Sequence, residues 1–202
     1  MTRPGSERER VLAIVRRAGI LRPRDLDRSG ISRTHLHRLE RQGLLERAGR
    51  GLYRLPSASL TEHHSLAAAC KLVPHGVICL LSALRFHDLT TQAPHEVWLA
   101  IDRRGWHPRH AVPPLRVVWF SGRALSQGIE VHRIEGVSVW VYGPAKTVAD
   151  CFKYRNKIGL DVALDALRDY RRWHPHGMDE LWRYARICRV ANVMRPYLEA
   201  LV

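Results

Sequence analysis

The sequence contains no apolar run long enough to cross a membrane. A membrane-spanning helix needs about 20 mostly apolar residues in succession, and the longest run, GVICLLSAL at 76–84, ends well short of that. We also expect no signal peptide, because the N-terminus is charged. We therefore expect a cytoplasmic protein that makes no use of a membrane.

Cysteine is scarce, and no two cysteines stand in a CxxC pair. The four cysteines are far apart in the chain, at Cys70, Cys79, Cys151 and Cys188. With this spacing we expect reduced, buried thiols. Histidine is abundant, but the pairs His63–His64 and His174–His176 have no cysteine at a ligand-like spacing. We expect surface or capping histidines, no metal and no cofactor.

Lysine is missing from the first 60 residues, and acids are outnumbered there. That segment has 14 arginines and 6 acids, a net charge of 14 minus 6, or +8, out of +14 for the whole chain. So much charge repels itself unless a polyanion or an acidic partner uses it. Forked guanidinium groups suit phosphate and guanine, although a GC-rich genome would explain the preference for arginine equally well. Composition therefore favours nucleic acid as the partner of a folded protein.

The N-terminal segment has the pattern of three short helices. A capping box formed by Ser6 and Glu9 predicts a helix over residues 7–18. A second short helix should begin near Pro23, and a third should occupy residues 32–42, with a glycine-containing turn between them. This order is typical of a helix-turn-helix.

The third helix should bury one face and present a basic one. At about 100° per residue, Leu36 and Leu39 define the buried direction. The residues that point directly away from it are Thr34, His37, Arg38 and Arg41. A solvated surface helix would mix in acids, and this outward set contains none. The face is suited to a polyanion, although a protein-interaction module with an arginine-rich face would have a similar pattern.

Two short apolar segments, LLER and GLYRL, follow the third helix and are separated by AGRG. Glycines permit the positive φ angles of a tight turn, so the pattern predicts a β-hairpin in the position of a wing. We expect DNA contacts from the second and third helices and the wing, at Arg22, Arg24, Ser32, Arg33, Thr34, His37, Arg38, Arg41, Arg47, Arg50 and Arg54.

Beyond the linker-like PSASLTEH, the sequence predicts a mixed α/β region with a helical end. A helix over 62–73 precedes GVICLLSAL, which reads as a buried strand that passes into a helix. EVWLAID, PLRVVWFSG, GIEVHRIEG and VSVWVYG are strand-like and bounded by Gly, Pro or Asp. A helix over 143–159 and two or three further helices follow. The predicted fold class is α+β, with an N-terminal winged helix-turn-helix and a mixed α/β C-terminal domain.

The winged-helix segment AGILRPRDLDRSGISRTHLHRLERQGLLERAGRGLYRL, followed by HGVICLLSAL, EVWLAI and GPAKTVADCFKYRNKIGLDVALDALRDY, resembles the AbiEi-type antitoxins of type IV toxin–antitoxin systems. The resemblance implies a bacterial phage-defence protein. Residues 1–58 would be a winged-helix DNA-binding domain that represses its own operon at inverted repeats, with possible self-association on DNA. Residues 61–202 would be the antitoxin domain, opposing a nucleotidyltransferase-like toxin without a stable complex.

Two other interpretations stay open at this stage. The chain could be a stand-alone regulator without a toxin. It could also be a metal-dependent nuclease, with candidate groups at Glu96, Asp102, Lys146 and Asp150, but we find no tight carboxylate cluster, phosphate loop or nucleophile arrangement. Lys146 and Asp150, at i and i+4, read more simply as a helix-surface pair. We expect no enzyme.

A second basic patch is predicted on the 143–159 segment. We expect four outward-facing cations there, Lys146, Lys153, Arg155 and Lys157, as a possible antitoxin surface that could meet nucleic acid or an acidic protein face. Ordinary solvated helix charges would give the same pattern.

Overall fold

The computed structural model describes residues 6–200, and its contacts divide the chain into two compact units. The first contains the chain up to Pro74 together with residues 106–115 and 132–139. The second contains residues 75–105, 116–131 and the chain from Trp140 onward. Residues 1–5 and 201–202, at the outer ends of the two predicted domains, lie outside the described range.

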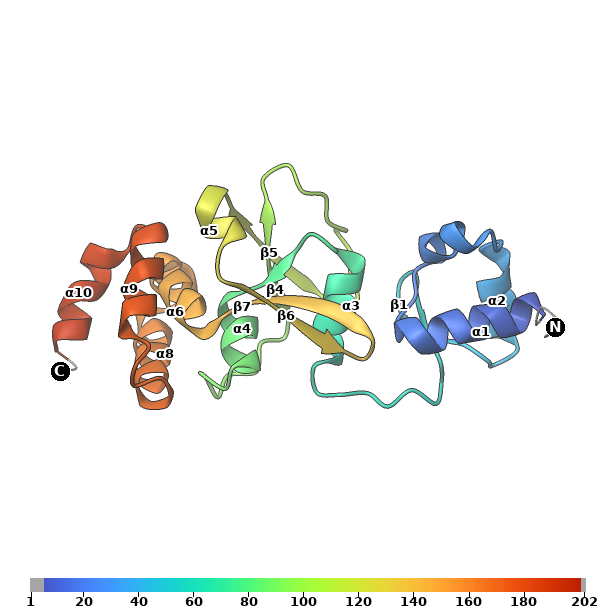
Figure 1. Ribbon diagram of the computed structural model, residues 1–202, viewed down its shortest axis with the longest axis horizontal. Helices are drawn as coiled ribbons and strands as arrows, with labels where there is room; N and C mark the ends of the chain where they lie inside the picture. The colour runs from blue at the N-terminus through green and yellow to red at the C-terminus, as the bar shows by residue number, and fades with distance from the viewer. Residues whose placement is uncertain (1–5, 201–202) are drawn as a thin grey trace. The chain divides into compact units, whose positions relative to one another are not determined.

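The N-terminal elements are those of a winged helix (Figure 1). They are α1 (Glu7–Ala18), the 3₁₀ helix η1 (Pro23–Ser29), α2 (Thr34–Arg41), β1 (Glu46–Gly49) and β2 (Leu52–Arg54). The capping box of α1 is confirmed, because Ser6 N–H donates to Glu9 Oε2 at 3.0 Å and Glu9 N–H donates to Ser6 Oγ at 3.3 Å. The three predicted helices and the wing are all present.

A small apolar core holds these elements together. Val11 and Val15 from α1 pack with Leu36 and Leu39 from α2, and all four are 0% exposed. The wing joins this core through a β-bridge, in which the backbones of Leu21 and Tyr53 exchange hydrogen bonds of 2.8 and 2.9 Å. The position of α2 is therefore fixed by packing on α1 and by the wing that follows it.

The remaining strands form one mixed sheet. After α3 (His64–Leu72) come β3 (Val77–Ile78), α4 (Leu80–Phe86), β4 (Val97–Asp102), β5 (Leu115–Phe120), α5 (Gly122–Ser126), β6 (Ile129–Ile134) and β7 (Val137–Tyr142). The strand order is β5-β4-β3-β7-β6, with β3 antiparallel to β4 and parallel to β7. Each strand-like segment of the sequence is a strand, so the predicted fold class is confirmed; α5 was not predicted.

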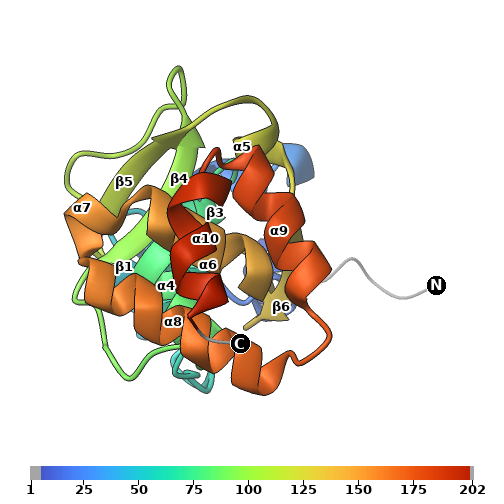
Figure 2. The ribbon, with the colours of Figure 1, turned by 90° about the vertical axis from the view of Figure 1, so that its left-hand side faces the viewer.

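The C-terminal part of the chain is helical. Its elements are α6 (Pro144–Lys153), α7 (Arg155–Ile158), α8 (Leu160–Trp173), α9 (Met178–Ile187) and α10 (Ala191–Glu199). Helix α6 packs against α4, α8 and α9, and α10 packs against α9 (Figures 1 and 2). No helix among the described residues is both long and apolar enough to span a membrane.

The predicted single helix over 143–159 is broken at Tyr154. This residue has φ −104° and ψ 14°, outside the helical range. Its hydroxyl donates to the carbonyl oxygen of Trp119 at 3.0 Å, and its ring stacks on Phe120 with centroids 5.4 Å apart. Tertiary contacts with β5 therefore accompany the end of α6, and the chain restarts as the short helix α7.

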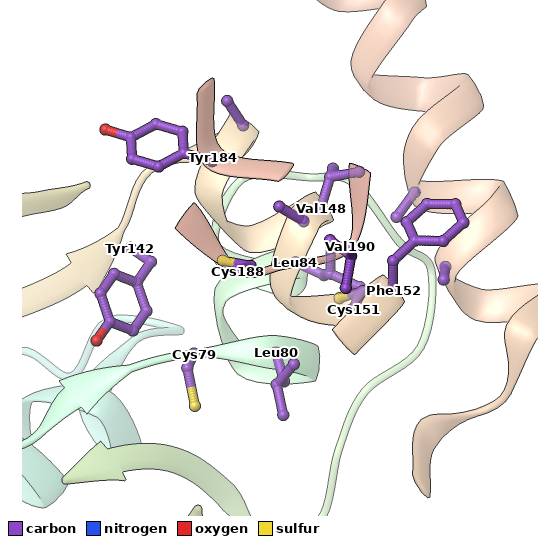
Figure 3. Close-up of a cluster of buried hydrophobic side chains, with 14 of the residues drawn as sticks. Cys79, Leu80, Leu84, Tyr142, Val148, Cys151, Phe152, Tyr184, Cys188 and Val190 are labelled. Carbon is purple, nitrogen blue, oxygen red and sulfur yellow. The ribbon is translucent and has the colours of Figure 1, made fainter. Parts of the chain in front are cut away.

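Helix α6 is buried along nearly its whole length. Every residue from 145 to 152 is buried, and Figure 3 shows side chains such as Leu84, Cys151 and Val190 meeting in the cluster around it. A helix that is buried all round must place any charged residue in the core as well.

Lys146 and Asp150 form that buried charge pair, so their prediction as a surface pair is wrong. Lys146 is 0% and Asp150 1% exposed, with Nζ 2.5 Å from Oδ2. Cys188 Sγ donates to the other carboxylate oxygen at 3.2 Å, and the ammonium lies 4.0 Å from the Tyr142 ring centroid. Burial raises the pKa of Asp150, and the charge of Lys146 opposes that rise.

We predict that Asp150→Asn destabilises the chain by about 3–5 kcal/mol, because it leaves the Lys146 ammonium buried without a counter-charge. The double variant Lys146→Met/Asp150→Leu should recover much of that loss, since it removes both buried charges. Urea denaturation at pH 7 measures both. A single variant as stable as the wild type would contradict the buried pair.

Candidate DNA-binding surface

The outward face of α2 is basic and exposed. Thr34, His37, Arg38 and Arg41 are all exposed, while Leu36 and Leu39 on the opposite face are fully buried. The predicted orientation of this helix is confirmed. A shallow hollow of about 600 Å³ follows the same face, lined by Thr34, His35, His37, Arg38, Arg41 and Gln42.

A hydrogen-bond chain positions Arg38 on this face. The Arg38 guanidinium donates to Nδ1 of His35 at 2.7 Å, and Nε2 of the same ring lies 2.7 Å from a carboxylate oxygen of Glu7. Arginine has only hydrogen-bond donors, so Nδ1 of His35 must accept the hydrogen bond from Arg38. Nε2 of the ring therefore carries the hydrogen and donates a hydrogen bond to the Glu7 carboxylate. Helix α1 thus orients a side chain of α2, which reduces the conformational freedom that Arg38 would lose on binding.

Four of the predicted DNA-binding arginines are paired with acids of the same unit. The pairs are Arg22–Asp25 at 2.7 Å, Arg33–Asp27, Arg47–Glu40 at 2.7 Å, and Arg54–Glu46. Each pair cancels a charge that composition alone would count toward DNA. Arg22 and Arg54 are also mostly covered, with side chains 18% and 16% exposed.

The Arg22–Asp25 pair is the most firmly held of the four. Burial alone would raise the pKa of Asp25, but hydrogen bonds from the Arg22 side chain and backbone, with the nearby Lys71, outweigh it and lower the pKa to about 2. This carboxylate stays ionised throughout the physiological range. We infer that the main role of Arg22 is to stabilise the start of η1 and not to contact DNA.

The other predicted residues keep their polar groups available to a partner. Arg24, Arg41 and Arg50 are exposed and form no ion pair with any residue between 6 and 200. Ser32 and Thr34 are exposed and share a hydroxyl hydrogen bond of 2.8 Å at the start of α2. Among the predicted residues, the cations without an ion pair therefore lie on α2, η1 and the wing tip.

One carboxylate joins the wing to α2. Glu40 accepts from Arg47 on β1 and lies 3.5 Å from Nδ1 of His37. The Tyr53 hydroxyl lies 3.4 Å from that same Nδ1, and the two rings meet edge to face. The Glu40 carboxylate raises the pKa of Arg47. The wing and the helix thus share one polar network.

Sequence reasoning missed three residues of this surface: Glu7, His35 and Gln42. Gln42 lines the hollow one helical turn after Arg38, and the i, i+4 spacing would have found it. The Glu7–His35 contact joins two helices, and no local spacing predicts it.

The second predicted patch is only partly exposed. Lys146 is wrong as an outward-facing residue, because it lies in the buried pair described above. Lys153 and Lys157 are exposed, whereas Arg155 is half-buried and donates to the Phe152 carbonyl oxygen at 2.9 Å. The patch therefore consists of three cations on two helices.

The nuclease candidates do not come together. Glu96 directly precedes β4 and Asp102 is its last residue, so the two acids lie at opposite ends of the strand. Glu96 lies 3.8 Å from Arg116, and Asp150 is buried against Lys146. Within residues 6–200, no three histidine, cysteine or acidic side chains form a group that could hold a metal ion.

Comparison with known families identifies the segment that carries this surface. Residues 9–56 match the family model described as "Transcriptional regulator, AbiEi antitoxin". A comparison with curated proteins gives no match. The matched range covers α1 from residue 9 onward, η1, α2 and both strands of the wing. The winged-helix segment of this chain is therefore similar to the AbiEi antitoxin family of transcriptional regulators.

Proposed function

We propose that this chain is a DNA-binding repressor and the antitoxin of a type IV toxin–antitoxin system, which regulates its own operon through inverted repeats. The observation that carries the proposal is the uncompensated basic face of α2, within the segment that matches the AbiEi family. Arg38 and Arg41 would read base edges in a major groove, which admits an α-helix. Arg50 at the wing tip would contact phosphate.

The proposal divides the work between two parts of the chain. Residues 1–58 would bind DNA, and residues 61–202 would oppose a nucleotidyltransferase-like toxin without forming a stable complex. Two copies would meet on an inverted repeat, since pseudo-palindromic operators match proteins that bind in pairs. No catalytic residue is proposed, and the chain would act by binding alone.

A second candidate function is a stand-alone transcriptional regulator without a toxin. It is favoured by the extent of the family match, which ends at residue 56 and leaves the sheet and the C-terminal helices outside it. DNA binding is common to both candidates, and protection against a toxin separates them.

Arg38 should read base edges in the operator. Arg38→Ala should weaken operator binding by about 1–3 kcal/mol and bring specific and random DNA closer together, because a lost base contact affects only the matching sequence. Competition binding with operator and scrambled duplexes measures this. Arg168→Ala, an exposed arginine of α8 that is paired with Asp165, removes the same charge and should leave the preference unchanged. Equal losses on both duplexes would show that Arg38 is not a reader.

Operator binding should also depend on the salt concentration. Operator affinity should fall steeply as salt rises, because phosphate contacts release counterions. Arg50→Ala should lower the slope of log K against log [salt] by about one and weaken all sequences alike. Arg54→Ala removes an arginine already paired with Glu46, so it should change the slope less. The same slope for wild type and Arg50→Ala would remove Arg50 from the interface.

Repression and protection should be separable by mutation. With toxin and antitoxin expressed from independent promoters, Arg38→Ala/Arg41→Ala should lose repression of an operon reporter and still protect growth. Lys153→Ala/Arg155→Ala/Lys157→Ala should lose protection and still repress. If the wild-type chain fails to protect against the neighbouring nucleotidyltransferase-like toxin, the stand-alone regulator replaces the antitoxin.

A further inference from the structure

A cavity of about 520 Å³ lies within the second unit, between α5, α6 and the end of α9. This volume falls in the range of about 300–1,000 Å³ that is usual for small-molecule sites. Its walls come from three separate segments of the chain. The lining residues are Trp119, Phe120, Ser121, Gly122, Arg123, Ala124, Asp150, Lys153, Tyr154, Arg186, Ile187, Cys188 and Arg189.

Four of these residues are exposed cations: Arg123, Lys153, Arg186 and Arg189. None of the four forms an ion pair with an acid of the described chain, in contrast to the paired arginines of the winged helix. Like charges that line one hollow repel one another, and an anion bound among them would relieve the repulsion. The lining therefore favours a ligand with more than one negative charge.

The single acid in the lining does not cancel this preference. Asp150 is 1% exposed, and its carboxylate is held by the Lys146 ammonium and by the Cys188 thiol. Its charge is balanced within the core, so the four exposed cations of the lining dominate the charge that a ligand would meet.

Aromatic rings make up another part of the lining. Trp119 is 45% exposed, and Tyr154 is half-buried with its ring stacked on Phe120 at 5.4 Å. A flat heterocycle stacks well on such rings, and every nucleobase has a suitable face. Rings beside several arginines and a lysine are the combination that binds a base together with its phosphates.

Arg189 is held in an unusual backbone conformation at this cavity. Its φ is +59°, in the left-handed region, just after the end of α9. Its N–H donates to the Arg186 carbonyl oxygen, and Val190 N–H donates to that of Ala185. Glycine is the usual residue at such a helix end because it takes positive φ without strain. Strained residues of this kind cluster at ligand sites.

We propose that this cavity binds a nucleoside phosphate, either as a free nucleotide or as the terminal nucleotide of a single-stranded RNA. The phosphates would lie against Arg186 and Arg189, with Arg123 and Lys153 at the sides, and the base would stack against Trp119 or Tyr154. This site is separate from the DNA-binding face of α2 and goes beyond the proposed function.

Equilibrium dialysis of the full-length chain tests the proposal with radiolabelled nucleoside triphosphates, inorganic triphosphate and a short single-stranded RNA as probes. We expect a nucleoside triphosphate to bind at least about fivefold more tightly than inorganic triphosphate, because stacking adds to the phosphate contacts. Competition between nucleotide and RNA would place an RNA end in the same cavity, and binding of nucleotide alone would identify a free nucleotide. Absence of binding by both overturns the proposal, as does equal binding of inorganic triphosphate.

Arg189→Gly is the decisive variant. Glycine suits the positive φ, so the urea midpoint should stay the same or rise, while nucleotide binding should fall about tenfold with the loss of a charge-assisted contact. Arg186→Ala should weaken binding similarly, and Arg168→Ala, exposed on α8, should not. Wild-type nucleotide affinity in Arg189→Gly would overturn the proposal.

A variant of the winged helix tests whether the nucleotide binds at the cavity or at the DNA-binding face of α2. Arg38→Ala/Arg41→Ala removes the uncompensated arginines of α2 and should retain nucleotide binding. Loss of nucleotide binding in that variant, with retention in Arg186→Ala, would move the ligand to the winged helix and reject the cavity.

Discussion

The burial of α6 on every side is the constraint on which the second unit depends. Residues 145–152 of α6 all lie in the core, and the helix packs against α4, α8 and α9. It also carries Lys146 and Asp150 into the interior, where each charge requires the other. The pair occupies the space between Tyr142, Phe120 and Cys188, so strand, helix and cavity share one set of contacts.

In the winged helix, acids decide which arginines remain available to a partner. Asp25, Asp27, Glu40 and Glu46 each engage one arginine and fix the local structure around it. The exposed face of α2 has cations without such partners, supported by Leu36 and Leu39 beneath. Net charge alone does not separate these two kinds of arginine. The structure does so through short-range geometry, and this division supports α2 as the candidate reader.

Local patterns in the sequence predict most of the elements. Apolar residues at helical spacing place α1 and α2, and Gly, Pro or Asp boundaries place β4 to β7, because these signals act within a few residues. Lys146 was predicted on the surface because an i, i+4 ion pair has the same spacing whether it lies in solvent or in the core. The break at Tyr154 was missed for a similar reason, since its partners Trp119 and Phe120 lie on a distant strand. The cavity is lined by three separate segments of the chain, so no single stretch of sequence predicts it.

The break at Tyr154 also divides the chain into two regimes of mutational tolerance. Up to Phe152, a polar or larger side chain would have to enter a filled core, where added or lost volume is costly. From Lys153 to Lys157 the side chains are exposed or half-buried, and the backbone turns through the short α7 before Gly159, at φ +97°, leads into α8. Adjacent stretches of one sequence motif are therefore free to evolve at different rates, the first constrained by folding and the second by whatever the surface binds.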